Sequence, residues 1–210
     1  MNATRLYLVR HGETEWNKRD VFRGHSDVLL NENGRTQAIE LGKAFETVAL
    51  RGIYASPLRR AAETAGAVAS ARGDKRSVII EGGLIDINRG EWEGMSRLQV
   101  QTKYPELYQE WLNFPTQVRF PGGDGLGDVE RRSRVVIEKV ASESQGAAAM
   151  IVTHHVVIRV LLCSMLELDL SCFRRFEALP ASVSELRFEY KCWVLHRLND
   201  VSHLGGAVLQ

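Results

Sequence analysis

The chain has 210 residues, of which 44% are hydrophobic and 25% charged, and its formal net charge is +1. This length suits one α/β domain with a well-buried core, so we expect residues 1–210 to form a single domain. A near-neutral charge gives no reason to expect nucleic acid or an anionic membrane as a partner, so any attraction for an anion must be local.

The first predicted element is a short buried strand over residues 6–9 (LYLV), which runs into a polar loop. Arg10, His11 and Gly12 begin this loop, at the position where an open α/β sheet places its ligand. Arginine offers a planar fork for a phosphate group, and histidine offers a nitrogen that can attack phosphorus. Gly12 would let the backbone approach the same ligand. This strand end therefore predicts a phosphate site.

The segment 15–30 is polar and is predicted to be a loop above that strand end. Arg23 and Gly24 lie within it, where they could reach a ligand bound at the first strand end. We interpret His25 and Asp27, which lie next to them, as solvated loop residues.

The second predicted strand carries a further anion signal. An amphipathic helix over residues 31–51 precedes this strand, which covers residues 53–56 and leads into an alanine-rich helix over residues 57–65. The N-terminus of a helix attracts anions, so arginine in its first turn is unfavourable for the helix alone. A bound anion is a natural reason for Arg59 or Arg60 at this position.

Acidic side chains follow the third predicted strand, which covers residues 78–80. They are Asp86, Glu91 and Glu93. Aromatic and apolar residues then predict two short helices within residues 96–128. Because this segment is longer than a usual connection, we expect it to form a small helical cap insertion.

A continuous apolar run over residues 147–153 (AAAMIVT) is typical of a central parallel strand that is buried on both faces. A charged helix is predicted before it over residues 128–144, and a second helix after it over residues 156–166. His154 and His155 stand between this strand and the helix, so they repeat the arrangement of the first strand end.

Strands that alternate with helices predict an α/β fold of three layers, a mostly parallel sheet with helices on both faces. The alternating apolar residues over 182–197 add two edge strands joined as a hairpin. In such a sheet the carboxyl ends of the parallel strands meet at one edge. We therefore expect Arg10, His11 and His154 to converge there with Arg59 or Arg60 and with an acidic residue of the segment 86–93.

Four matches in the same order resemble the histidine phosphatase superfamily, the phosphoglycerate mutase-like proteins. The matches are RHGET at residues 10–14, S-x-L-x-R-A-x-x-T at 56–64, L-x-D-x-x-x-G-x-W-E-G at 84–94, and the histidine at position 154. The resemblance implies that Arg60 contacts the phosphoryl group, that Asp86 is the general acid and that His154 lies beside the transferred group. It also places Arg23 and Gly24 near the substrate.

The sequence departs from the family pattern at two of these sites. Asp86 stands where family members usually have glutamate, and its shorter side chain would hold the acid farther from the leaving oxygen. Asp86 remains the predicted acid, with Glu91 and Glu93 as the fallback. His155 stands where glycine is common, which predicts a narrower floor of the substrate pocket.

The resemblance implies hydrolysis of a phosphomonoester through a phosphohistidine on His11. Two arginines, Arg10 and Arg60, and a protonated His154 would neutralise the phosphoryl group. Asp86, a carboxylic acid kept protonated by anionic surroundings, would give the leaving group its proton and then take one from water. This chemistry requires no metal and no cofactor, and the substrate would be a small phosphorylated metabolite.

We favour a phosphatase over two alternatives, a phosphoglycerate mutase and a phosphate-binding module without activity. The chain is shorter than typical mutases of the family and lacks their Glu-Arg-His-Tyr-like run after the third strand. The three cysteines are far apart and show no metal-ligand spacing, and no signal peptide or membrane span is apparent, so we expect a cytoplasmic protein. The sequence indicates neither the particular substrate nor the oligomeric state.

Overall fold

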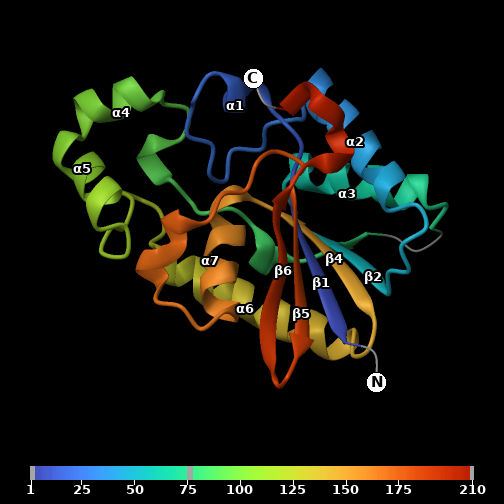
Figure 1. The fold of residues 1–210 in the computed structure, drawn as a ribbon. Helices are drawn as coiled ribbons and strands as arrows, with labels where there is room; N and C mark the ends of the chain where they lie inside the picture. The colour runs from blue at the N-terminus through green and yellow to red at the C-terminus, as the bar shows by residue number, and fades with distance from the viewer. Residues whose placement is uncertain (1–2, 75–77, 209–210) are drawn as a thin grey trace.

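The computed structural model describes residues 3–74 and 78–208, and this part of the chain forms one six-stranded sheet in the order β3-β2-β4-β1-β5-β6 (Figure 1). The strands are β1 (Thr4–Arg10), β2 (Gly52–Ala55), β3 (Ile79–Ile80), β4 (Ala148–Thr153), β5 (Val183–Glu189) and β6 (Cys192–Asp200). β1 pairs in parallel with β4, β4 with β2, and β2 with β3. β5 pairs antiparallel with β1 and with β6. The predicted α/β fold with a mostly parallel sheet is confirmed.

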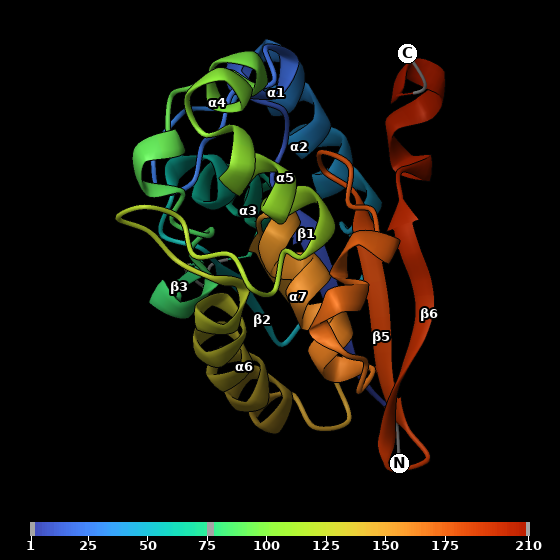
Figure 2. The same cartoon turned by 90° about the vertical axis from the view of Figure 1, so that its left-hand side faces the viewer.

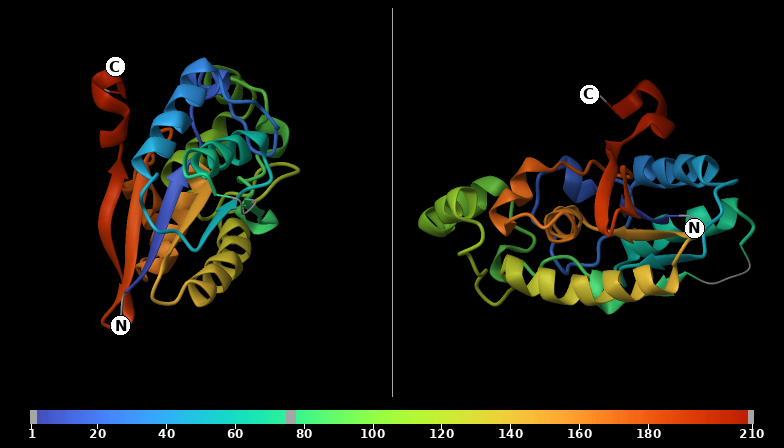
Figure 3. Two further views of the ribbon diagram at one scale, coloured as in Figure 1. Left: turned by 90° about the vertical axis from the view of Figure 1, so that its right-hand side faces the viewer. Right: turned by 60° about the horizontal axis from the view of Figure 1, so that its bottom comes forward.

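Helices cover both faces of this sheet. They are α1 (Glu15–Lys18), α2 (Glu32–Ala44), α3 (Arg59–Ala71), α4 (Arg97–Lys103), α5 (Pro105–Asn113), α6 (Leu126–Glu143) and α7 (His155–Met165). Successive side chains of a strand point to opposite faces, so Leu6 and Leu8 of β1 pack with α6 and α7, whereas Tyr7 and Val9 pack with α2 and α3. Figures 2 and 3 show these helices on the two sides of the sheet. The structure therefore has the three predicted layers.

The segment 96–128, which we predict to be a cap, packs around a tryptophan. Trp92 is fully buried, and its ring centroid lies 6.0 Å from that of Tyr108 in α5 and 4.9 Å from that of Phe120. Trp111 is also buried, whereas Phe114 is exposed. The buried aromatic residues of α5 and of the neighbouring loops thus extend the core that β1, α6 and α7 form, on the side of the sheet where α4 and α5 lie (Figure 1).

Several predicted element boundaries differ from those observed. The predicted loop after β1 contains the short helix α1, which the side chain of Thr14 caps. Helix α2 ends at Ala44, well before residue 51. Phe45 is its C-cap, and by Arg51 the chain has already joined the sheet, since the N–H of Arg51 donates to the carbonyl of Ala148. Strand β5 is not an edge strand, since it lies between β1 and β6. In the described ranges no helix is both long and apolar enough to cross a membrane.

The ends of three adjacent parallel strands, β2, β4 and β1, position the residues of the candidate site. Arg10 of β1 pairs with Thr153 of β4, and Ala55 of β2 pairs with Val152 of β4. The residues that follow these strands, His11, Ser56 and His154, are therefore brought to the same edge of the sheet.

Candidate active site

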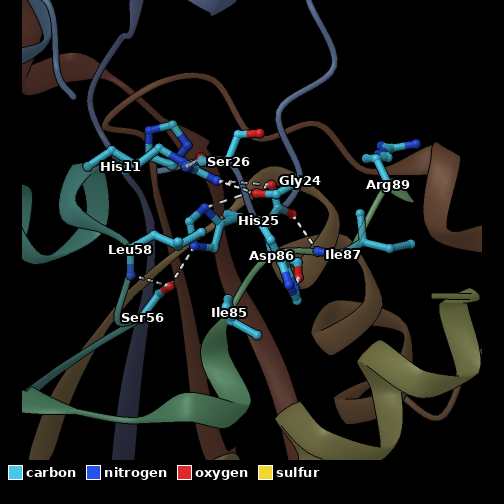
Figure 4. A network of polar contacts seen from close by, with 12 residues as sticks. His11, Gly24, His25, Ser26, Ser56, Leu58, Ile85, Asp86, Ile87 and Arg89 are labelled. Atoms are coloured by element: carbon cyan, nitrogen blue, oxygen red, sulfur yellow. Dashed lines mark hydrogen bonds and ion pairs between the residues drawn. The ribbon is translucent and has the colours of Figure 1, made fainter. Parts of the chain in front are cut away.

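Two buried histidines, His11 and His154, lie at this edge, and Figure 4 shows the first of them. The backbone N–H of His11 donates to the carbonyl of Thr153 at 3.0 Å, which places His11 beside the end of β4. The ring centroids of His11 and His154 are 5.2 Å apart, and both side chains are almost completely buried. The ladder between β1 and β4 thus brings together the two histidines that the sequence predicts as neighbours.

The ring of His11 is fixed in one tautomer. Its Nδ1 lies 2.6 Å from the carbonyl oxygen of Gly12, and because a carbonyl only accepts, Nδ1–H is the donor. The lone pair of the ring is then on Nε2. Burial, together with the positive charges of Arg60 and Arg10, lowers the pKa of His11 well below 6.5. His11 is therefore neutral near pH 7, as a nucleophile must be.

His154 is held by the strand end next to it. Its Nε2 lies 2.7 Å from Oγ of Ser56, and its Nδ1 lies 3.9 Å from Oδ2 of Asp86. Burial and the charge of Arg60 lower the pKa of His154 well below 6.5, so it is neutral in the free protein. The expected protonated form thus requires the negative charge of a bound phosphoryl group.

Two buried arginines adjoin the histidines. Nη1 of Arg10 donates to the carbonyl of Ala178 at 2.7 Å. Arg60, at the start of α3, is fully buried and donates to the carbonyls of Ser26 at 2.8 Å and Gly24 at 2.9 Å. Arg59 is exposed, so of the two arginines in this turn Arg60 is the one at the site.

Gly24 and Gly12 shape the backbone of the site. Gly24 has φ +53°, and a Cβ there would lie 2.0 Å from a carboxylate oxygen of Glu93, so only glycine fits without rearrangement. A Cβ on Gly12 would lie 2.4 Å from the carbonyl oxygen of Gly34. The structure shows a close approach of Gly12 to α2, and its approach to a ligand stays a prediction.

Asp86 is the acidic residue that the structure brings to the two histidines. Its Oδ2 lies 3.4 Å from Nη2 of Arg60, and its Oδ1 accepts from the N–H of Ile87 at 2.9 Å. The contacts of Asp86 are thus with cationic and neutral groups, so the anionic surroundings that we expected would come only from a bound phosphate.

The two fallback acids are engaged elsewhere. Glu93 accepts from the backbone N–H groups of His25 and Ser26 at 2.7 and 2.8 Å, so its carboxylate joins two loops. Glu91 is exposed and accepts from the hydroxyl of Tyr104 at 2.5 Å. The geometry therefore favours Asp86 for acid chemistry.

A cavity of about 440 Å³ opens above these residues. Arg10, Arg23, Gly24, Asp86 and His155 line it, as do Phe22, Arg89 and Arg97, which the sequence analysis did not single out. His11, Arg60 and His154 are at most 1% exposed, and Asp86, which lines the cavity, contacts Arg60 and His154. In the described ranges no group of three or more His, Cys, Asp or Glu side chains is placed to hold a metal ion.

Comparison with known proteins gives the family. The model of the histidine phosphatase superfamily (branch 1) matches residues 6–201. The chain belongs to the histidine phosphatase superfamily. It is 37% identical over 201 residues to phosphoserine phosphatase 1 of Hydrogenobacter thermophilus, covering 96% of this chain and 94% of that protein. The predicted enzyme class, a phosphoric monoester hydrolase of this superfamily, is confirmed.

Other similar proteins fall in the same superfamily. The protein is 30% identical over 210 residues to a protein of Erwinia tasmaniensis named Probable phosphoglycerate mutase GpmB, covering 97% and 96% of the two chains. The solved structure of Bacillus stearothermophilus YhfR has a TM-score of 0.88 and 31% identity, covering 96% of this chain and all of the other. The predicted phosphoglycerate mutase-like fold is thus confirmed.

In this histidine phosphatase His155 forms a bridge to a residue that the sequence analysis missed. Its Nε2 lies 2.8 Å from Oε1 of Glu177, and the same carboxylate oxygen accepts from the N–H of Ala178 at 2.9 Å. Because the carbonyl of Ala178 holds Arg10, this bridge supports the segment that positions Arg10. Glu177 is 22 positions from His155, so no local spacing could have indicated the pair.

Proposed function

We propose that this chain is a metal-independent phosphatase that hydrolyses a small phosphomonoester through a phosphohistidine on His11. The observation that carries the proposal is the state of His11. Its ring is neutral, with Nδ1 bonded to the Gly12 carbonyl and its lone pair on Nε2, and the positive charges of Arg60 and Arg10 act on it. A neutral nitrogen beside cations suits attack on a dianion.

In the first step the phosphoryl oxygens accept from Arg10, Arg60 and His154, whose pKa the dianion raises again. Nε2 of His11 then bonds to phosphorus as the bond to the leaving oxygen breaks. Asp86 gives its proton to the leaving alkoxide, so the alcohol departs neutral.

In the second step a water molecule replaces the alcohol beside Asp86. The carboxylate removes a proton from this water, and the oxygen bonds to phosphorus as the bond to His11 breaks. Inorganic phosphate leaves, and His11 and Asp86 return to their starting states.

A mutase is the second candidate, because one relative is named a probable phosphoglycerate mutase. The first step would be the same, but a phosphoglycerate hydroxyl would accept the phosphoryl group in place of water. The absence of the Glu-Arg-His-Tyr-like run supports the phosphatase.

The unpaired state of Cys163, Cys172 and Cys192 favours a cytoplasmic place of action.

The test is phosphate release from para-nitrophenyl phosphate and from a panel of metabolites that includes phosphoserine, with EDTA present. We expect the wild type to release phosphate and His11→Ala to lose at least about a thousandfold in kcat/KM, because the nucleophile is gone. His196→Ala, on β6, is the control and should retain full activity.

Three other results would count against the phosphatase. Release that stops with EDTA would contradict metal independence. Transfer between 3-phosphoglycerate and 2,3-bisphosphoglycerate without release would show a mutase. Binding of phosphate without release or transfer would leave a binding module.

A further inference from the structure

Arg89 is a cavity-lining arginine with no role in the mechanism above. It follows Asp86 by three positions and lies on the opposite side of the polar network from His11 (Figure 4). Its guanidinium carbon is 4.7 Å from the ring centroids of both Trp111 and Phe120, two aromatic residues of the cap core. Stacking against these rings fixes the plane of the guanidinium and leaves its N–H edge to bind other groups.

The positive charge of Arg89 has no bonded anion among the described residues. Its Nη1 is buried there without a hydrogen-bond partner. The two nearby carboxylates are used elsewhere: Asp86 contacts Arg60, and the Glu93 carboxylate accepts from backbone N–H groups, including that of Arg89 itself. An unpaired buried donor is costly, and more so when it is charged, so this guanidinium suits an anionic group supplied from outside the chain.

The position of Arg89 indicates which anion this is. Arg10, Arg60 and the two histidines already account for the phosphoryl group, and Figure 4 shows Arg89 on the other side of the polar network from His11. Arg10, Asp86 and Arg89 all line the same cavity of about 440 Å³, a volume that holds one small molecule. A planar carboxylate accepts two parallel hydrogen bonds from the edge of a guanidinium.

We propose that Arg89 binds a carboxylate carried by the substrate, so that the enzyme selects phosphomonoesters that bear a carboxylate a few bonds from the phosphate. This inference rests on the proposed phosphatase function and adds the substrate class to it. Arg89 is then a specificity residue that acts on the far end of the substrate, away from the reacting phosphorus.

The test uses substrates that differ only in the carboxylate. One pair is phosphoserine with phosphoethanolamine, and the other is 3-phosphoglycerate with glycerol 3-phosphate; para-nitrophenyl phosphate reports the chemistry alone. In at least one pair we expect the wild type to prefer the carboxylate-bearing member by about tenfold or more in kcat/KM, as charged hydrogen bonds allow. Arg89→Met should abolish this preference and change hydrolysis of para-nitrophenyl phosphate less than about threefold.

Arg97→Met is the matched control. Arg97 also lines the cavity, but its side chain is 56% exposed and already pairs with Asp20. The control removes the same charge from the rim, so it should keep the wild-type preference and thereby exclude a general electrostatic effect. Where Arg89→Met fails to fold, Arg89→Lys retains the charge without the planar fork and should lose most of the preference.

The outcomes separate this inference from the proposed function. Hydrolysis of para-nitrophenyl phosphate with no carboxylate preference in the wild type, or with a preference that survives in Arg89→Met, would overturn the carboxylate site and leave the phosphatase standing. A wild type that hydrolyses none of the five compounds would overturn the phosphatase, and this inference with it.

Discussion

The cavity has two sides that are built in different ways. On the strand side, His11, Ser56 and His154 directly follow β1, β2 and β4, and backbone ladder bonds fix their positions. On the loop side, Arg23, Gly24, Asp86 and Arg89 lie on two segments that side-chain bonds hold together. Glu93 makes most of these bonds, with both carboxylate oxygens on backbone N–H groups.

This difference suggests a division of tasks. Adjacent parallel strands cannot shift without breaking the sheet, so the strand side suits a step that requires fixed geometry, such as attack on phosphorus. Loops tolerate changes in length and sequence, so the loop side suits the choice of substrate. Asp86 is the exception, because it lies on the loop side and we propose that it acts in the chemical step.

Replacement of Asp86 by asparagine tests this exception and should have a large effect. We expect kcat on an alkyl phosphate such as phosphoserine to fall by about 10²–10⁴, because general acid catalysis is lost. Hydrolysis of para-nitrophenyl phosphate should fall far less, since nitrophenolate leaves without a proton. The measurement is kcat for the two substrates with each protein.

Glu91→Gln is the control for this change, because Glu91 is exposed and bonded to Tyr104, and it should behave as wild type. Near-full activity of Asp86→Asn on phosphoserine would contradict the role of Asp86. It would move the acid to Glu91 or Glu93 and make the loop side a substrate-choosing side only.

The same division explains what could be predicted from the sequence. A buried strand that ends in Arg10 and His11, and another that ends in His154, are local patterns, and parallel pairing brings such ends together. The sheet, its helices on both faces and the convergence of the two histidines therefore followed from the sequence. Ser56 lies within a recognised motif, but its bond to His154 joins two motifs that are 98 positions apart.

The loop side depends on contacts between segments that are distant in the sequence. Glu93 binds the backbone of residues 25 and 26, and nothing near Glu93 indicates those partners. Arg89 is one arginine among many in the sequence, and its aromatic neighbours come from the cap. Periodicity and motif spacing report only local structure, so both roles required the folded structure.

Arg10 depends on both kinds of contact, since it is the last residue of β1 but the carbonyl of Ala178, 168 positions away in the sequence, holds its guanidinium. We expect Glu177→Gln to lower kcat/KM for para-nitrophenyl phosphate by about three- to tenfold, because the segment that positions Arg10 loses its charged bonds to His155 and Arg159. Glu189→Gln, on the hairpin near His196, is the matched control. The measurement is kcat/KM for para-nitrophenyl phosphate as a function of pH, in wild type and in Glu177→Gln. If the variant has the same kcat/KM and the same pH dependence as wild type, the end of β1 alone positions Arg10.

The smallest expected effect is the contribution of the His155 bridge to stability in acid. Burial lowers the pKa of His155 from 6.5 to about 4, so between these values the unfolded chain binds a proton that the folded protein does not. The free energy of unfolding must then fall as the pH falls from 6.5 to 4, by about 1 kcal/mol from this partly exposed side chain. Urea unfolding of wild type and His155→Gln at pH 7 and pH 4.5 measures this term. The variant should lose less stability than the wild type on acidification, and an equal loss in both would place the acid sensitivity on His11 and His154 of the strand side.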